Sequence, residues 1–318
     1  MSAAISPERK SPALSIQLQN FSAEDPGSWQ PLLDLARAAD TVGVDRLVVS
    51  DHVVFGENLG AYANPEIGGI EGGQQPTGPD GHWLEPLTLL SVISGITERV
   101  RLLTGILIAS LRRPVVLAKS TATLDVLSGG RLDLGVGVGW QREEYQAAGL
   151  RFEGRGRTLD RTLELCQLFW REQSARFDSE DLSFESIHFS PKPLQPGGVP
   201  LWISGTLNRN VLRRIVRFGS GWIPWGPDAL DPARSLVQVR EALEAAGRDT
   251  QGFEVTAALP VKREGGKVDF ARTMERVPAM WEAGITDFRA RTSFPEDANE
   301  AHDLLAAWVA AFREAAGR

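Results

Sequence analysis

Short apolar runs alternate along the chain with longer stretches in which apolar residues recur every three or four positions. A short apolar run is typical of a buried parallel strand, and the longer spacing is typical of a helix with one buried face. On this basis, strands are predicted at residues 14–19, 45–50, 100–108, 131–138, 200–204, 221–225, 253–259 and 285–291. Helices are predicted at residues 28–42, 85–97, 114–127, 158–170, 208–218, 232–246, 270–283 and 298–316.

The order of these elements predicts the fold class. Eight strands, each followed by a helix, are typical of βαβ units that build a parallel sheet. Eight such units in 318 residues fit a (β/α)8 TIM barrel with insertions. A doubly wound open sheet is the alternative. The first turn between strand and helix, residues 20–28, lacks the G-x-G-x-x-G of a dinucleotide-binding fold, and this favours the barrel.

Three segments depart from the alternation. Residues 55–84 are rich in Gly, Pro, Asn and Gln without a sustained period, so we expect an insertion that forms a lid or substrate wall. Residues 176–190 alternate in polarity, which predicts an added hairpin. Residues 1–12 are polar, lack the apolar segment of a signal peptide and are expected to be a disordered or loosely attached tail. Residues 13–318 are expected to form a single domain.

Composition narrows the classes of function. The 34 Lys and Arg against 41 Asp and Glu give a net charge of −7, which argues against a nucleic-acid partner. A single cysteine excludes an internal disulfide framework, and the four histidines show no metal-binding spacing, so no metal site is expected. The apolar runs are too short to cross a membrane. These features predict a cytoplasmic protein.

In a barrel, the residues that follow the carboxyl ends of the strands form the active site. Asp51 and His52 follow the second predicted strand, and a histidine there can transfer a proton near neutral pH. The alternative is an aspartate that caps a turn and a histidine that only packs. Gly105 lies inside the run LLTGILIAS, where a glycine marks either close approach to a ligand or crowding inside the barrel.

Two glycine-containing segments could approach a ligand. Gly135, Gly137 and Gly139 alternate in LGVGVGW and leave one face of a strand bare, which suits either a flat ring or a tight barrel interior. Ser204, Gly205 and Thr206 precede a predicted helix, whose free N–H groups can bind phosphate. Ordinary helix capping by Thr206 or Asn208 is the alternative for that segment.

Several of these segments resemble one family. Residues 104–149, TGILIASLRRPVVLAKSTATLDVLSGGRLDLGVGVGWQREEYQAAG, resemble the core signature of the luciferase-like monooxygenase superfamily. SDHVV at residues 50–54 resembles its second-strand motif, and GGVPLWISG at 197–205 resembles its phosphate-loop region. The combination is most similar to the branch that uses coenzyme F420, a deazaflavin.

The resemblance implies a (β/α)8 barrel, a hydride-transferring oxidoreductase and, commonly, a homodimer. It implies a non-prolyl cis peptide at Gly105-Ile106, forming a bulge behind the cofactor ring. His52 and Asp51 are the implied catalytic residues, and Trp140, His82 and Trp83 are the candidate substrate-binding residues. The implied cofactor-binding residues are Asp51, Gly105, Ile106, Ile108, Ser110, Gly137, Gly139, Trp140, Ser204, Gly205 and Thr206.

The sequence also departs from the family pattern. Members that oxidise sugar phosphates carry a carboxylate where Trp140 stands, and the family's G-D-G-W segment has Ser220 in place of Asp. Glu143 and Glu144 follow Trp140, but the sequence does not give their direction. Two alternatives therefore stand beside the F420 enzyme. One is an FMN-dependent monooxygenase that uses oxygen, and the other is a barrel that binds a ligand without catalysis.

Overall fold

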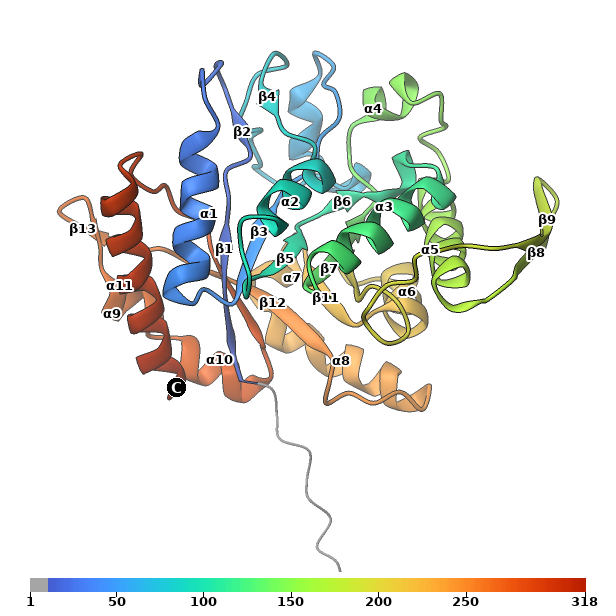
Figure 1. The fold of residues 1–318 in the computed structure, drawn as a ribbon. Coiled ribbons are helices and arrows are strands. Elements are labelled where there is room, and N and C mark those ends of the chain that lie inside the picture. The colour runs from blue at the N-terminus through green and yellow to red at the C-terminus, as the bar shows by residue number, and fades with distance from the viewer. Residues whose placement is uncertain (1–10) are drawn as a thin grey trace, which may run out of the picture.

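Parallel strands close into a barrel in the computed structural model, which describes residues 11–318 (Figure 1). Neighbouring strands pair in the order β1-β3-β5-β7-β10-β11-β12-β15, and β15 pairs with β1 to close the ring. The eight strands are β1 (Ala13–Gln17), β3 (Arg46–Val49), β5 (Arg101–Thr104), β7 (Leu132–Gly137), β10 (Leu201–Gly205), β11 (Gly221–Pro224), β12 (Glu254–Leu259) and β15 (Asp287–Ala290). The predicted (β/α)8 TIM barrel is confirmed, and the open sheet is excluded.

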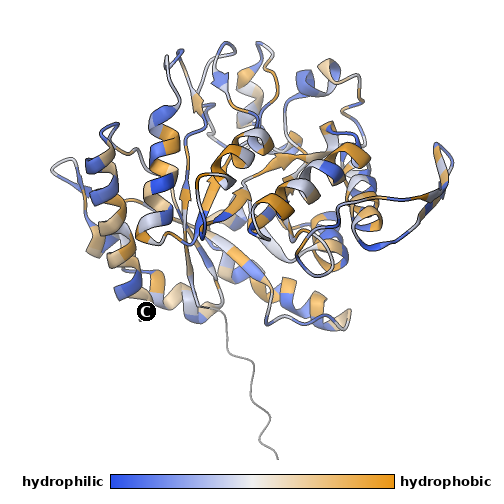
Figure 2. Cartoon of the chain, in the orientation of Figure 1, coloured by the Kyte–Doolittle hydropathy of each residue, from blue (hydrophilic) through white to orange (hydrophobic). Residues whose placement is uncertain are grey.

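Helices surround the barrel and connect successive strands (Figure 1). Figure 2 shows mainly hydrophobic colouring on the central strands and mixed colouring on the helices around them. Proline stands in the first turn of several helices, where its missing N–H leaves no hydrogen bond unmade. The helices are α1 (Gln30–Val42), α2 (Pro86–Ser94), α3 (Pro114–Leu127), α4 (Arg142–Ala147), α5 (Arg155–Arg171), α6 (Arg209–Phe218), α7 (Pro227–Leu230), α8 (Pro232–Ala245), α9 (Phe270–Met274), α10 (Val277–Ala283) and α11 (Ala298–Ala316).

Two predicted elements are divided in the structure. The predicted strand 100–108 is interrupted after β5, and its second part, β6 (Leu107–Ile108), pairs with β7. The predicted helix 270–283 is divided into α9 and α10. Pro278 stands in the first turn of α10 and has no N–H to donate to the carbonyl of Met274, so one continuous helix cannot form. Helix α4 lies in a segment for which no helix was predicted.

The departures from the barrel lie at its periphery. The insertion contains two short 3-10 helices, Leu59–Ala63 and Pro65–Ile67, and β4 (His82–Trp83), which pairs with β2 (Phe21–Ser22). The segment predicted as a hairpin contains β8 (Ala175–Ser179) and β9 (Leu182–Ile187), which pair antiparallel and project from the body (Figure 1). A small ribbon joins β13 (Arg263–Glu264) to β14 (Lys267–Val268). The expected tail, residues 1–12, falls mostly outside the described residues. Within residues 11–318, no helix has the length and apolar character to cross a membrane.

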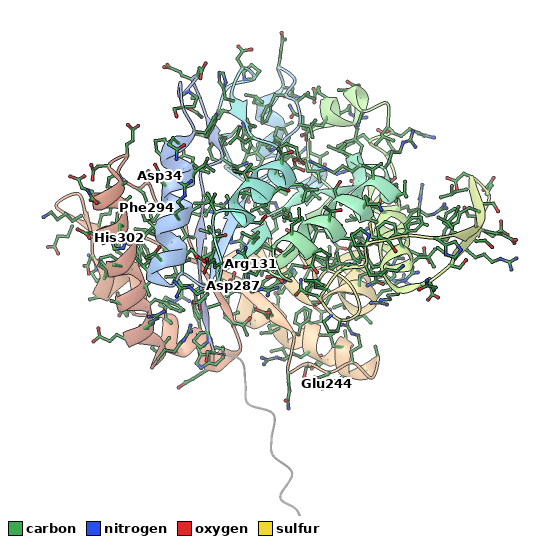
Figure 3. All side chains as sticks on the ribbon, viewed as in Figure 1. Asp34, Arg131, Glu244, Asp287, Phe294 and His302 are labelled. Carbon is green, nitrogen blue, oxygen red and sulfur yellow. The ribbon has the colours of Figure 1, made fainter. Side chains whose placement is uncertain are left out.

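The barrel interior is layered. At the amino ends of the strands lies a charged network in which Arg46 donates to Asp133 at 3.1 Å, Glu254 at 3.1 Å and Asp287 at 2.6 Å. Figure 3 labels Asp287 among the strands, away from the outer surface. The next layer is apolar and consists of Val48, Leu103, Trp202 and Ile223. Side chains from the carboxyl ends of the strands complete the interior and form the floor of the candidate site.

Candidate active site

The carboxyl ends of the parallel strands bring the predicted segments to one end of the barrel. His52 follows β3, Gly105 follows β5 and Trp140 follows β7. The rings of His52 and Trp140 lie 5.9 Å apart, centre to centre. The structure therefore places the histidine predicted to be catalytic beside the tryptophan predicted to line the substrate site.

His52 is held on both sides of its ring. Its Nδ1 lies 3.2 Å from Glu144 Oε1, and its Nε2 lies 3.1 Å from the side-chain nitrogen of Gln75. The same Glu144 oxygen accepts a hydrogen bond from the backbone N–H of Val53 at 2.8 Å. A carboxylate beside Nδ1 favours the tautomer with the proton on Nδ1. Nε2 is then the nitrogen that can accept or release a proton.

Aromatic side chains surround the imidazole. Phe55 lies 4.6 Å from it and Trp83 4.9 Å, measured between ring centres, and the His52 side chain is only 11% exposed. Trp83 also stacks on Phe21 and donates from Nε1 to Thr77. His82, the other substrate-binding candidate in β4, is exposed. Of the two neighbours predicted from the sequence, Trp83 is the one that contacts His52.

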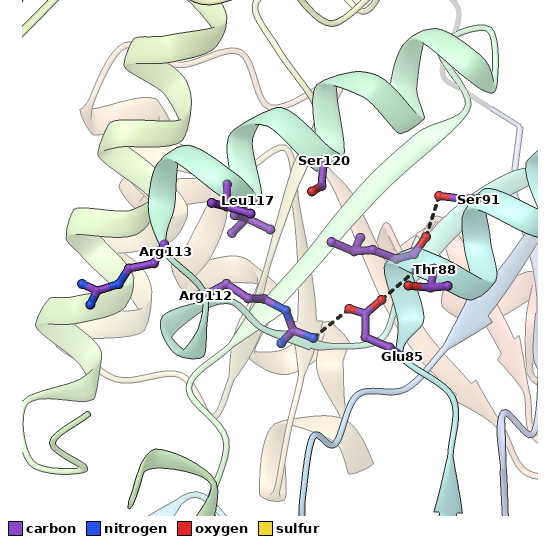
Figure 4. Close-up of a pocket in the computed structure, with 9 residues that line it drawn as sticks. Glu85, Thr88, Ser91, Arg112, Arg113, Leu117 and Ser120 are labelled. Carbon is purple, nitrogen blue, oxygen red and sulfur yellow. Dashed lines mark hydrogen bonds and ion pairs between the residues drawn. The ribbon is translucent and has the colours of Figure 1, made fainter. Parts of the chain in front are cut away.

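Asp51 anchors the loop after β6. Its carboxylate accepts from the backbone N–H of Ile108 at 2.8 Å and from both terminal nitrogens of Arg112, at 2.5 and 3.0 Å. Arg112 also donates to Glu85 at 2.9 Å, on the edge of a groove of about 400 Å³ between α2 and α3 (Figure 4). Burial alone would lower the pKa of Arg112. The Asp51 carboxylate opposes this effect, and the pKa of Arg112 is raised overall. Arg112 is therefore ion-paired rather than free to hold an anion.

The bare face of β7 is covered by isoleucine side chains. The peptide Gly105-Ile106 is cis, as the family resemblance predicts. A Cβ on Gly137 would lie 2.9 Å from Ile106 Cδ1, and one on Gly139 would lie 3.1 Å from Ile108 Cδ1. A side chain at either position would require these isoleucines to shift. The glycines therefore make room for side chains inside the barrel, which is one of the two interpretations given from the sequence. The other, that they make room for a flat ring, stays a prediction.

Ser110 is a buried hydroxyl that connects the loop after β6 to α4. Its Oγ lies 2.5 Å from the hydroxyl of Tyr145, which donates to the carbonyl of Val138 at 2.6 Å. Burial raises the pKa of Tyr145 to about 12, so its hydroxyl remains a donor at neutral pH. These bonds fix α4, and with it Glu144, against the loop that carries the cis peptide.

The segment predicted to bind phosphate is engaged within the chain. Asn208 caps α6 by accepting from two backbone N–H groups, and Thr206 donates to the carbonyl of Trp225 at 3.0 Å. Arg213 and Arg214 both pair with Asp160. Capping by Asn208 is thus the observed arrangement, and phosphate binding by Ser204, Gly205 and Thr206 stays a prediction.

The insertion covers the mouth of the barrel. Trp225 Nε1 donates to the carbonyl of Gly69 at 3.0 Å, and Arg155 donates to the carbonyl of Ile67 at 2.9 Å. Tyr62 of the insertion lies 5.3 Å from Trp140, centre to centre. Together with the contact between Gln75 and His52, these bonds place the insertion over the site, and its role as a lid or substrate wall stays a prediction. Gln75 was not singled out from the sequence, because nothing in a loop without a period indicates which polar residue turns inward.

The site fits a planar ring that carries both hydrogen-bond donors and acceptors. Buried polar atoms without a partner gather at this end of the described barrel: Trp140 Nε1, Glu144 Oε2, Gln17 Oε1, and Arg289 Nε and Nη2. Such atoms are costly to bury unless a ligand or water satisfies them. A flavin or deazaflavin has carbonyl oxygens, an imide N–H and an apolar face, which suit these atoms and the aromatic wall.

Known proteins resemble this chain over most of its length. The family model described as "Luciferase-like monooxygenase" matches residues 13–303. An uncharacterized protein of Mycobacterium tuberculosis is 36% identical over 182 residues, which are 56% of this chain and 62% of the relative. The chain thus spans less than two thirds of that relative's length. An F420-dependent glucose-6-phosphate dehydrogenase of Kineococcus radiotolerans is 31% identical over 237 residues, covering 73% of this chain and 63% of that protein.

Solved structures give the same fold. An F420-dependent secondary alcohol dehydrogenase in complex with an F420-acetone adduct superposes with a TM-score of 0.72, at 17% identity, over 96% of this chain and 100% of that one. A type II Baeyer-Villiger monooxygenase of Pseudomonas putida in complex with FMN has a TM-score of 0.68, at 15% identity, over 93% of this chain and 96% of that one. These likenesses concern the fold, while the family model, which matches residues 13–303, shows that the chain belongs to the luciferase-like monooxygenase family.

Proposed function

We propose that this protein is an oxidoreductase that transfers a hydride between coenzyme F420 and a small organic substrate. The observation that carries the proposal is His52, held by a buried carboxylate at the mouth of the barrel. A hydride added to a carbonyl, or removed from an alcohol, must be accompanied by a proton, and His52 Nε2 is positioned to exchange one. The relative that is 31% identical is F420-dependent, which favours the deazaflavin.

The bound deazaflavin would supply two-electron chemistry, and the chain would orient it. Asp51 fixes the loop at Ile108, on which the ring is proposed to rest. Glu144 keeps the Nδ1 proton of His52 in place, so that Nε2 can move a proton. The insertion excludes water from the site, and Trp140 forms part of the wall for substrate. Catalytic roles for His52 and Asp51, and cofactor contacts from the other predicted residues, belong to this proposal.

Fluorescence titration of the protein with F420 and, separately, with FMN tests the choice of cofactor. We expect micromolar binding of F420 and binding of FMN at least tenfold weaker. Tighter binding of FMN would contradict the choice of deazaflavin and favour the oxygen-using monooxygenase, for which the FMN-containing structural neighbour is the specific observation. Binding of neither cofactor would contradict both enzyme proposals and favour a barrel without catalysis.

The cytoplasmic location stays a prediction.

We also propose that the protein forms a homodimer through α2 and α3. Trp308 and Phe312 of α11 are 0% and 1% exposed, so they belong to the core and offer no interface. Val92 of α2 and Val115 and Val116 of α3 are 47%, 48% and 60% exposed. Glu85 and Arg113 stand at the rim of the groove between these helices, so a two-fold axis could pair opposite charges across a self-complementary face (Figure 4).

Replacing Val116 with Glu is expected to convert the dimer to a monomer, because two carboxylates would be buried near the axis. Light scattering coupled to size exclusion measures the mass. Leu230→Glu is the control, since Leu230 is 82% exposed on α7 and should leave the dimer intact. A wild-type chain that elutes as a monomer at all concentrations would contradict the proposal.

A further inference from the structure

Arg289 is a buried cation with two guanidinium nitrogens that lack an acceptor. It lies in β15, is 3% exposed, and its Nε and Nη2 have no partner among residues 11–318 and no contact with solvent. The nearest carboxylate along its strand, Asp287, already accepts from Ser15, Arg46 and Thr256. Burial lowers the pKa of Arg289 to about 10, so the guanidinium remains charged at neutral pH. A charged group held dry without partners is unfavourable unless something binds to it.

The guanidinium lies next to the loop that carries the cis peptide. A Cβ on Gly105 would lie 2.9 Å from Arg289 Nη1 and would also meet Val48 Cγ1. Gly105 follows β5, whereas Arg289 belongs to β15, and two strands, β1 and β3, stand between them around the barrel. The side chain therefore crosses the interior of the barrel. It ends between the apolar layer below and the mouth of the barrel above.

Gln17 contributes an unpartnered acceptor near the same place. Its amide nitrogen donates to the carbonyl of Val48 and to Ser50 Oγ, both at 3.2 Å, while its Oε1 has no solvent contact and no partner among the residues that the structure describes. Gln17 is in register with Val48, the residue that meets the Gly105 position together with Arg289. Because the nitrogen is fixed by its two acceptors, the direction of Oε1 is fixed as well.

The two residues together discriminate among ligands. A carboxylate would satisfy Arg289 but would place further lone pairs near Gln17 Oε1. A carbonyl oxygen beside an N–H satisfies both, because the oxygen accepts from the guanidinium and the N–H donates to Oε1. This pair of groups is the imide edge of a pyrimidinedione. Flavins, deazaflavins and pyrimidine substrates all carry it.

We propose that Arg289 and Gln17 form a subsite that binds the imide edge of a heterocyclic ring, and that this ring is the cofactor of the proposed function, on which the inference rests. The subsite fixes the ring in its plane from the barrel interior, across the site from the insertion that covers the mouth. It gives a role to a buried cation and a buried acceptor that have no partner in the described part of the chain.

The test is the affinity of F420 and of FMN for the full-length protein, measured by fluorescence for the wild type, Arg289→Met and Gln17→Met. We expect each variant to weaken the better-binding cofactor by roughly ten- to a hundredfold, which corresponds to losing a hydrogen bond that involves a charged partner. Arg291→Met, which changes the exposed arginine that directly follows the end of β15, is the control and should change the affinity less than twofold. Thermal unfolding verifies that each variant folds. If Arg289→Met does not fold, Arg289→Lys takes its place, because lysine keeps the charge but lacks the planar pair of donors.

The imide edge could belong to the cofactor ring or to a pyrimidine substrate, and the affinities of a flavin-like probe and of uracil distinguish the two. Lumiflavin should bind the wild type more tightly than 3-methyllumiflavin, in which a methyl group replaces the imide hydrogen that donates to Gln17, and Gln17→Met should abolish this preference. If uracil instead binds the wild type but not Arg289→Met, and cofactor affinity is unchanged, the assignment to the cofactor is overturned. Equal affinities of every variant for all probes overturn the subsite while leaving the proposed function intact. A wild type that binds neither cofactor overturns the proposed function itself.

Discussion

Replacing Glu144 with Gln is expected to lower turnover by roughly a hundred- to a thousandfold, while cofactor affinity changes by less than threefold. Glutamine keeps the size of the side chain and can still accept from the N–H of Val53. It removes the carboxylate that holds the Nδ1 proton of His52 and that would stabilise the imidazolium during proton transfer. Glu144 acts through His52, so it is a positioning residue.

Two measurements distinguish this role from a structural one. Nitrogen-15 NMR of the His52 ring should show Nδ1 protonated in the wild type and a mixture of tautomers in the variant. Steady-state kinetics should place the loss in kcat rather than in KM, with Glu144→Asp recovering part of it. Glu143→Gln is the matched control, because the Glu143 side chain lies against Gly56 and makes no bond to His52. Equal losses for the two variants would argue against the pairing of Glu144 with His52.

The barrel could be predicted because its elements are local. Each strand is a short apolar run, and each helix carries its own spacing, so eight units appear without knowledge of contacts. The charged residues inside the strands could not be interpreted in the same way. Arg46, Asp133 and Asp287 interrupt apolar runs and look like solvent-facing positions, yet they meet inside the barrel across separations of 87 and 241 residues. Only closure of the barrel brings their strands together.

The candidate site was predictable to a similar degree. His52 could be found because it ends a strand, and the end of a barrel strand is a functional position whatever the neighbours. Its partners could not be found, since Glu144 lies 92 residues away on a short helix and Gln75 belongs to an insertion without a period. Arg289 was missed for a related reason. Its strand is buried on both faces, and no alternation of polarity marks the side that faces the interior.

Arg46→Met is expected to destabilise the protein by about 3–5 kcal/mol, the cost of leaving buried carboxylates without their cation. Asp133 and Asp287 both accept from Arg46, and the Arg46 side chain is 3% exposed. Thermal unfolding at neutral pH should show a midpoint lower by on the order of 10 °C. Arg37→Met is the control, because the pair between Arg37 and Asp34 is 47% and 36% exposed and should contribute less than about 1 kcal/mol.

The pH dependence of this difference distinguishes loss of the charge network from loss of packing. Burial alone would raise the pKa of Asp133. Arg46 and Arg101 outweigh this effect, so the pKa of Asp133 in the folded protein lies below the ordinary value of 3.8. The stabilisation from this carboxylate is therefore complete above pH 4 and is lost as the pH falls through the folded value. The wild type and Arg46→Met should converge in stability below that range. Adding Asp287→Asn to Arg46→Met should recover part of the loss at pH 7, because it removes one of the unpaired charges. A deficit that stays constant from pH 7 to pH 3 would indicate that packing around Arg46 matters more than its charge.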